Sequence, residues 1–294
     1  MSEIVEAEAP AVEPGAPRGE AIELLPPEHL RREIWALSWP VILSFALDSI
    51  LGLASILMVG RLGADAVGAV GLGNQVLGAV RAGIAAVGTG TVALVARDVG
   101  AGDREHADVV LTQSVIFGVL VSTLIAIPVI VLAPYALAIF RVKGPMADLG
   151  VSYLRIVMLS EPAAGIFLMC AAALRGAGET RTPLWIGGLI DILAILLNYV
   201  LIFGKFGIPA LGVVGSALAA LIAIAIGGWL FLWALSMRDS ILHFRWRELW
   251  PDFDLARRIL KVGYPAAIEQ LVIQFGLFAY VRDFGFAVAP RDAR

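Results

Sequence analysis

The run VIFGVLVSTLIAIPVIVLA, residues 115–133, decides the fold because it contains no charged side chain. A helix needs about 20 apolar residues to cross a hydrocarbon core of about 30 Å. Similar runs recur along the chain, and the hydropathy pattern predicts membrane-spanning helices at 35–60, 67–96, 108–132, 150–174, 183–204, 211–236 and 263–283. The predicted fold class is therefore an all-α integral membrane protein, a polytopic helical bundle.

The composition of the whole chain supports this class. Of 294 residues, 59% are hydrophobic and 16% are charged, with a mean hydropathy of +0.86. Soluble domains have about 45–50% apolar and about 25% charged residues. The net charge of −3 excludes a basic nucleic-acid-binding protein.

The residues that carry enzyme chemistry are sparse. The single cysteine, Cys170, cannot form an internal disulfide, and the three scattered histidines lack the spacing of a zinc or haem site. The sequence contains no phosphate-binding loop with its lysine and no assembled Ser–His–Asp set. We therefore expect no catalytic residues, no metal site, no enzyme activity and no organic cofactor.

The chain divides into four predicted parts. Residues 1–30 hold seven Glu, five Pro and one Arg and predict a disordered acidic tail. Residues 31–236 contain six of the predicted spans, which we expect to form the six-helix N-terminal lobe of a larger bundle. Residues 237–262 are basic, carry Trp246 and Trp250, and predict an amphipathic helix that lies along the lipid headgroups. Residues 263–294 supply the first helix of a second, incomplete lobe.

Lysine and arginine predict the orientation in the membrane. The N-terminal tail and the second, fourth and sixth loops carry thirteen of these residues, and the other three loops carry four. The positive-inside rule then places the N-terminus and residues 237–262 in the cytoplasm. We expect a plasma membrane location, in bacteria the inner membrane.

A short repeat indicates two similar halves. A basic pair stands seven or eight residues before an aromatic–proline step in two places. These are Arg31-Arg32 with Trp39-Pro40, and Arg257-Arg258 with Tyr264-Pro265. The two prolines are 225 residues apart, which is room for six helices and is typical of transporters built from repeated halves. On this interpretation the chain is truncated just after it enters its second half.

Five ionisable residues fall inside the predicted spans: Asp48, Arg81, Glu161, Asp191 and Glu269. A charge at this depth costs at least ~2.5–3.5 kcal/mol, so each needs a partner, water or a function. A carboxylate in a poorly hydrated pocket is able to hold a proton or a cation and to release it when the pocket opens. Asp48 and Asp191 are the predicted ion-coupling residues.

Structural interpretations stay open beside this one. Asp48 or Asp191 alternatively neutralises Arg81 in a structural pair, and Glu161 bonds to backbone loosened by Pro162. Glu269 alternatively extends to the membrane interface. The amides of Asn74, Gln75 and Asn198 serve equally well as contacts between helices.

Four sequence motifs carry a resemblance to a known family. They are MVGRLG at 58–63, AVGLGN at 69–74, LRGAGETRTP at 174–183 and FGIPALGVVGSA at 206–217. Together they resemble the multidrug and toxic compound extrusion (MATE) family of cation antiporters, over roughly residues 34–283. The motif residues are Arg175, Gly176, Gly178, Thr180, Pro183, Gly207, Pro209, Gly212 and Gly215.

The resemblance implies secondary active export of organic cations, drugs and toxic compounds in exchange for Na⁺ or H⁺. Two six-helix bundles would alternate access around a central cleft. In such proteins a helix-one carboxylate often carries the coupling ion, but this sequence has Ser55 there; in helix five it has Asn198, with Ala194 one turn earlier.

Asp48 and Asp191 stand seven residues before Ser55 and Asn198. Seven residues are about two helical turns, so each aspartate stays on nearly the same face, ~10 Å toward the cytoplasm. We hypothesise that in this sequence both ion-coupling carboxylates stand two helical turns earlier than in other members of the family, at Asp48 and Asp191. Ser55, Arg81, Glu161, Asn198 and Glu269 are the candidate cavity-lining or substrate-binding residues.

Two other functions remain open. A lipid-linked sugar flippase of the same superfamily needs a cleft rich in basic groups, for which Arg81 is the main candidate. A non-transporting fragment, or a half-transporter that pairs with a second lobe on another chain, is the other. The expected partners are the lipid bilayer, small cationic substrates and, in the last case, that second lobe.

Overall fold

The computed structural model describes residues 27–140, 144–237 and 240–288. Most of the predicted acidic tail, the loop at 141–143 and the chain end at 289–294 lie outside the described residues. Residues 1–36 and 37–294 form separate units. The packing described below belongs to the second unit.

The described part of the chain is built from helices, without a β-strand. They are α1 (Pro27–Gly60), α2 (Ala64–Gly100), α3 (Arg104–Ala138), α4 (Pro145–Met158), α5 (Glu161–Gly176), α6 (Arg181–Phe203), α7 (Gly212–Leu235) and α8 (Phe253–Val288). The predicted all-α class is confirmed.

Five of these helices are long and apolar enough to cross a membrane, and the number is six if α4 and α5 form one bent span. These six coincide with the first six predicted spans, from 35–60 to 211–236. The seventh predicted span, 263–283, lies inside α8, which is not in that set among the described residues. A seventh membrane crossing therefore stays a prediction.

The prediction of one continuous helix over 150–174 was wrong. The chain bends by 50° between α4 and α5. At the break, the backbone N–H of Ser160 donates to the carbonyl of Val157 at 3.0 Å, a short turn that ends α4. Pro162 follows in the first turn of α5, where its missing N–H would have no helical partner. The hydropathy of the run conceals this break because both halves are apolar.

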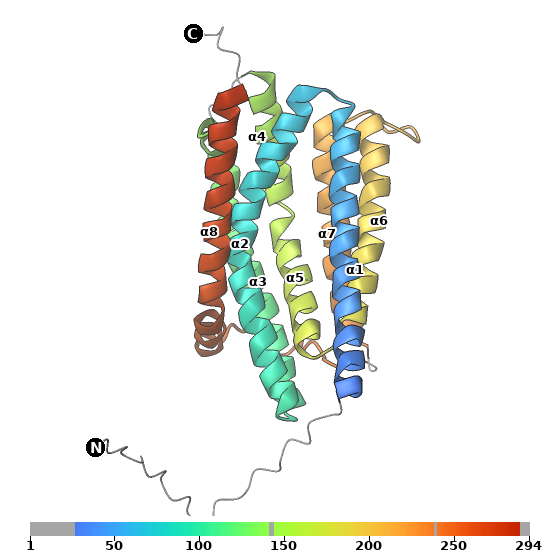
Figure 1. Ribbon diagram of the computed structural model, residues 1–294, viewed down its shortest axis with the longest axis vertical. Coiled ribbons are helices and arrows are strands. Elements are labelled where there is room, and N and C mark those ends of the chain that lie inside the picture. The colour runs from blue at the N-terminus through green and yellow to red at the C-terminus, as the bar shows by residue number, and fades with distance from the viewer. Residues whose placement is uncertain (1–26, 141–143, 238–239, 289–294) are drawn as a thin grey trace, which may run out of the picture. The chain divides into compact units, whose positions relative to one another are not determined.

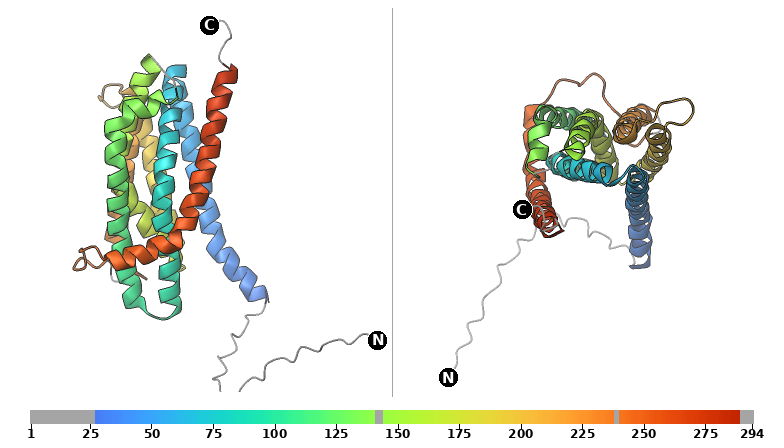
Figure 2. Two further views of the ribbon diagram at one scale, coloured as in Figure 1. Left: turned by 90° about the vertical axis from the view of Figure 1, so that its left-hand side faces the viewer. Right: turned by 90° about the horizontal axis from the view of Figure 1, so that it is seen from above.

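Helix α2 is the centre of the packing. It contacts α3, α4, α5 and α8, while α5 also packs on α3 and α7, and α6 packs on α7. Figures 1 and 2 show α8 and α1 on opposite sides of α2. Glycines permit the close approaches: a β-carbon would stand 2.7 Å from the Gly118 oxygen at Gly165, 2.7 Å from the Val92 oxygen at Gly176 and 2.5 Å from the Leu201 oxygen at Gly215.

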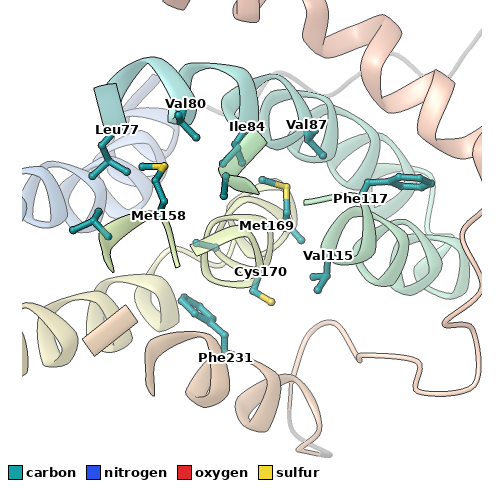
Figure 3. Packing of buried hydrophobic residues seen from close by; sticks show 14 of the residues in the cluster. Leu77, Val80, Ile84, Val87, Val115, Phe117, Met158, Met169, Cys170 and Phe231 are labelled. Atoms are coloured by element: carbon teal, nitrogen blue, oxygen red, sulfur yellow. The ribbon is translucent and has the colours of Figure 1, made fainter. Parts of the chain in front are cut away.

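The hydrophobic core lies between α2, α3, α5 and α7 (Figure 3). Ile84 of α2 and Phe231 of α7 are fully buried in it. Cys170 of α5 is also fully buried among these apolar side chains. Its role is therefore packing, in agreement with its apolar neighbours in the sequence.

The segment between α7 and α8 differs from its prediction. Residues 240–252, called the linker below, contain no helix, so the amphipathic helix expected over 237–262 is present only from residue 253 onward. Helix α8 instead starts at Phe253, because the Asp252 carboxylate accepts from the N–H groups of Asp254 (2.9 Å) and Leu255 (3.1 Å) and caps it. Trp246 and Trp250 are 57% and 88% exposed, as side chains at a headgroup interface require.

Side chains of α3 fix the linker in place. Gln113 donates from Nε2 to the carbonyl oxygens of Glu248 (3.0 Å) and Trp250 (2.8 Å), and its Oε1 accepts from the Asp252 N–H at 2.9 Å. At the preceding residue, the Thr112 hydroxyl accepts from the N–H of Arg245 at 3.0 Å. The linker is thus an ordered strap in the absence of a helix.

Candidate functional site

Two polar pairs join α1 to α6. The carboxyl groups of Asp48 and Asp191 face each other closely enough to interact. Two turns further along, Asn198 Nδ2 donates to Ser55 Oγ at 3.2 Å. In both pairs the partners are 143 residues apart, so α1 and α6 lie parallel and in register. The structure brings together the four residues that the equal seven-residue offsets linked.

The two helices contribute differently to these pairs. Asp191 and Asn198 are 9% and 5% exposed, whereas Asp48 is open to the surroundings. Leu51, between the two polar positions of α1, packs against Ile190 and Ala194 of α6. The buried Oδ1 of Asn198 has no hydrogen-bond partner. The pairs therefore place buried oxygen acceptors beside one carboxyl group that an ion can reach.

Two carboxyl groups that face each other have a chemical requirement. An ionised carboxylate is an acceptor only, so a hydrogen bond between two carboxyl groups needs one proton. Without that proton, two negative charges face each other at a depth where water is scarce. Such a pair takes up a proton or a small cation readily.

A second charged pair lies between α2 and α5. Arg81 contacts the Oε1 atom of Glu161 through Nε at 3.4 Å and Nη2 at 3.3 Å. Glu161 is completely buried, and its Oε2 has no partner. This answers two of the open alternatives: Arg81 has its ion pair with Glu161 rather than with an aspartate, and Glu161 contacts a side chain rather than loosened backbone.

Arg81 also connects the two pairs electrostatically. Its side chain is 45% exposed and interacts through its charge with Asp48. Next to it, the Tyr153 hydroxyl of α4 donates to Asn74 Oδ1 of α2 at 2.9 Å. Asn74 is thus a contact between helices, and sequence reasoning missed Tyr153 because a tyrosine in an apolar run gives no sign of its partner.

Glu269 lies apart from this group. It is exposed on α8, and within the described residues it forms no hydrogen bond or ion pair with Asp48, Asp191, Arg81 or Glu161. Its predicted role in the cavity gains no support from the geometry. The other residues proposed to line the site, Ser55 and Asn198, do lie beside the aspartate pair.

The family motif at residues 174–183 forms the α5–α6 turn. Arg175 ends α5, Gly178 has a φ of +81°, which an L side chain rarely adopts, and Pro183 is buried in α6. Thr180 precedes α6, but the side chain that caps it is Glu179, whose Oε1 accepts from the N–H groups of Arg181 (2.8 Å) and Thr182 (3.0 Å).

The family motif at residues 206–217 forms the α6–α7 turn. Gly207 and Gly212 have φ values of +83° and +56°, Pro209 lies between them, and Gly215 packs on the Leu201 backbone. The glycine-rich motifs therefore shape the turns and the helix contacts. The charges described above lie outside them.

The MatE family model matches residues 40–200. This range covers α1 from Pro40 to most of α6, and so includes both polar pairs and the Arg81–Glu161 contact. The chain belongs to the MatE family.

Relatives and solved structures agree with MatE membership. The chain is 30% identical to the probable multidrug resistance protein NorM of Thermotoga maritima, over 86% of this chain and 54% of that one. It is 30% identical to the multidrug resistance protein PmpM of Pseudomonas aeruginosa, over 81% of this chain and 50% of that one.

Among solved structures, an outward-facing multidrug resistance MATE transporter of the MOP superfamily superposes with a TM-score of 0.77 at 27% identity, over 84% of this chain and 54% of that one. An inward-facing conformation of a MATE transporter gives a TM-score of 0.71 at 26% identity, over 81% and 55%. The MatE chain thus spans about half the length of the relatives that it matches.

Proposed function

We propose that this MatE chain acts in the efflux of organic cations, drugs or toxic compounds, in exchange for Na⁺ or H⁺. The observation that carries the proposal is the pairing of Asp48 with Asp191 across α1 and α6. Two carboxyl groups held together, one open and one buried, form a site whose occupancy by a cation changes its charge. No cofactor beyond the coupling ion is needed.

The exchange follows from electrostatics. With neither proton nor metal ion, the pair is negative and attracts an organic cation. A proton or Na⁺ on the pair removes that charge and weakens the hold on the cargo, so that one cation replaces the other. The carboxylate oxygens of the pair suit a hard cation such as Na⁺ as well as a proton.

The flippase alternative loses its main support. A site for an anionic lipid-linked sugar needs unpaired basic groups, and Arg81 shares its charge between Glu161 and Asp48. The local charge around α1, α2 and α6 favours a cationic cargo instead.

Alternating access needs a wall that faces this lobe. We propose that a second lobe supplies it, since the full-length relatives are about twice as long. The positive-inside count supports a cytoplasmic N-terminus and a location in the plasma membrane, in bacteria the inner membrane.

The test is accumulation of a fluorescent organic cation in everted membrane vesicles that contain this chain, under a Na⁺ gradient and then under a pH gradient. Asp48→Asn and Asp191→Asn should each abolish the gradient dependence. The matched control is Asp65→Asn, an exposed aspartate in the first turn of α2. A gradient dependence that is present in wild type and unchanged in both site variants would exclude the aspartate pair as the coupling site.

Vesicle transport requires both lobes, whereas cation binding requires one. The same variants should therefore also be compared by equilibrium binding of tetraphenylphosphonium to the purified chain in lipid nanodiscs. Binding that both site variants lose and Asp65→Asn retains supports the site even where transport is absent.

A further inference from the structure

Arg81 contacts Glu161 in a way that leaves the ion pair incomplete. Both guanidinium contacts go to the same oxygen, at 3.3 and 3.4 Å. Charge-assisted hydrogen bonds are normally about 2.7–2.9 Å long, and arginine commonly binds both oxygens of a carboxylate. Here Oε2 of Glu161 is buried with no partner at all. An unsatisfied buried carboxylate oxygen costs free energy, so this arrangement is weaker than a bidentate ion pair.

The two members of the pair also differ in their freedom to move. The side chain of Glu161 is completely buried in the first turn of α5, beside the break in the α4–α5 span. The side chain of Arg81 is 45% exposed. A change of partner must therefore come from the arginine, which has a long side chain and open space around part of it.

A second acidic partner is already close. Arg81 interacts electrostatically with Asp48, the exposed member of the aspartate pair. The other titratable group that feels its charge is the Tyr153 hydroxyl of α4, which is held by Asn74. One guanidinium thus stands between two acidic groups, Glu161 on α5 and the Asp48–Asp191 pair between α1 and α6.

We infer that Arg81 is a tethered cation that competes with the transported cation for the Asp48–Asp191 pair and has Glu161 as its partner whenever that pair is neutralised. When a cation occupies the aspartates, it repels Arg81, which then neutralises Glu161. When the aspartates are empty, Arg81 is drawn toward Asp48 and fills the site from within. The transported cation must therefore displace a charge that the protein itself supplies. This inference rests on the proposed function.

The sign of two substitutions tests this inference. Arg81→Gln removes the competitor and should tighten tetraphenylphosphonium binding to the full chain in nanodiscs, on the order of 5- to 150-fold, the usual range for coupled sites. Glu161→Gln removes this partner, leaves Arg81 to Asp48 and should weaken binding. Fixed charges would also change binding with opposite signs, so the double variant is the one that separates competition from a static ion pair, whose two charges would cancel.

Three further variants complete the experiment. Arg81→Lys keeps the charge and should bind nearly as wild type does. The double variant Arg81→Gln with Glu161→Gln leaves no buried unpaired charge, so it should fold where a single variant fails, and should bind as tightly as Arg81→Gln. In an Asp48→Asn, Asp191→Asn background, Arg81→Gln should have no effect on binding.

Each result has one meaning. Changes in the same direction for Arg81→Gln and Glu161→Gln, a double variant that binds no more tightly than wild type, or an Arg81→Gln effect that persists without the aspartates, overturn the competition while the aspartate site stands. Cation binding that does not depend on Asp48 and Asp191 overturns the proposed function and the competition together.

Discussion

Gly263 of α8 lies so close to Ala86 of α2 that a β-carbon on Gly263 would overlap the Ala86 carbonyl oxygen. One turn away, Gly90 of α2 lies equally close to the carbonyl oxygen of Ile259 in α8. The two helices therefore meet backbone to backbone, in the manner of helix pairs in membranes that pack through small residues.

Gly263→Leu should separate α8 from α2. Overpacking of a close contact costs about 1–3 kcal/mol, so the variant should unfold at a lower temperature. The matched control is Gly276→Leu on the same helix, where a β-carbon would meet nothing within 4 Å. Thermal unfolding in detergent compares the two, and equal midpoints would show that the close contact does not contribute to stability.

The hydrogen bond between Ser55 and Asn198 should be measurable as a coupling energy. In a double-mutant cycle with Ser55→Ala and Asn198→Ala, we expect a coupling of about 0.6 kcal/mol, the average for such bonds between membrane helices. Ser49→Ala is the control, because Ser49 Oγ donates only to the Phe45 carbonyl of its own helix, at 2.7 Å. Strict additivity of the two free energies of unfolding would contradict the contact.

Gly204→Ala should destabilise the α6–α7 turn. Gly204 ends α6 with a φ of +68°, and a β-carbon there would stand 2.5 Å from the Ala210 nitrogen. The left-handed conformation alone costs an L residue about 1–2 kcal/mol, and the contact adds to it.

Gly187→Ala provides the opposite control for this turn. Gly187 lies within α6 with open space around it, so alanine there should raise the free energy of unfolding by about 0.5–1 kcal/mol. Unfolding experiments that find the same sign for both glycines would refute the role of the turn.

Gln113→Ala should release the linker from α3. The variant loses three hydrogen bonds to the backbone of residues 248–252, each worth about 0.5–1.5 kcal/mol. The Asp252 amide should then exchange its hydrogen at least about tenfold faster, which corresponds to a loss of about 1.4 kcal/mol. Gln270→Ala, at an exposed position of α8, should leave this rate unchanged. Unchanged exchange in both variants would mean that Gln113 does not secure the linker.

The sequence predicted the spans well because membrane insertion depends on summed apolarity, which a linear pattern records. It did not predict the break before Glu161, because proline is common in membrane helices and does not by itself mark a change of direction. It placed the linker helix wrongly because the cap at Asp252 and the contacts of Gln113 depend on residues far away in the chain.

The candidate site was predictable in part for the same reason. Asp48 and Asp191 have equal offsets from Ser55 and Asn198. Two parallel helices in contact bring residues of equal offset to the same level, so the offsets indicated which residues would pair. The partner of Arg81 was not predictable, since charge alone does not distinguish among four carboxylates that lie in different spans. The depth of Arg81 along α2 and the rotation of α2 place its guanidinium beside Glu161.

The hydrogen bonds of Gln113 end at Asp252, the residue that also caps α8. The contact of Gln113 with Asp252 consequently ties α3 directly to the start of α8. Figure 2 shows α8 changing direction within its length. Pro265 lies inside α8 and has no backbone N–H, so one helical hydrogen bond is absent there, which permits such a kink. The start of α8 is therefore held in place, and any helix that follows α8 in a longer relative continues from a fixed direction.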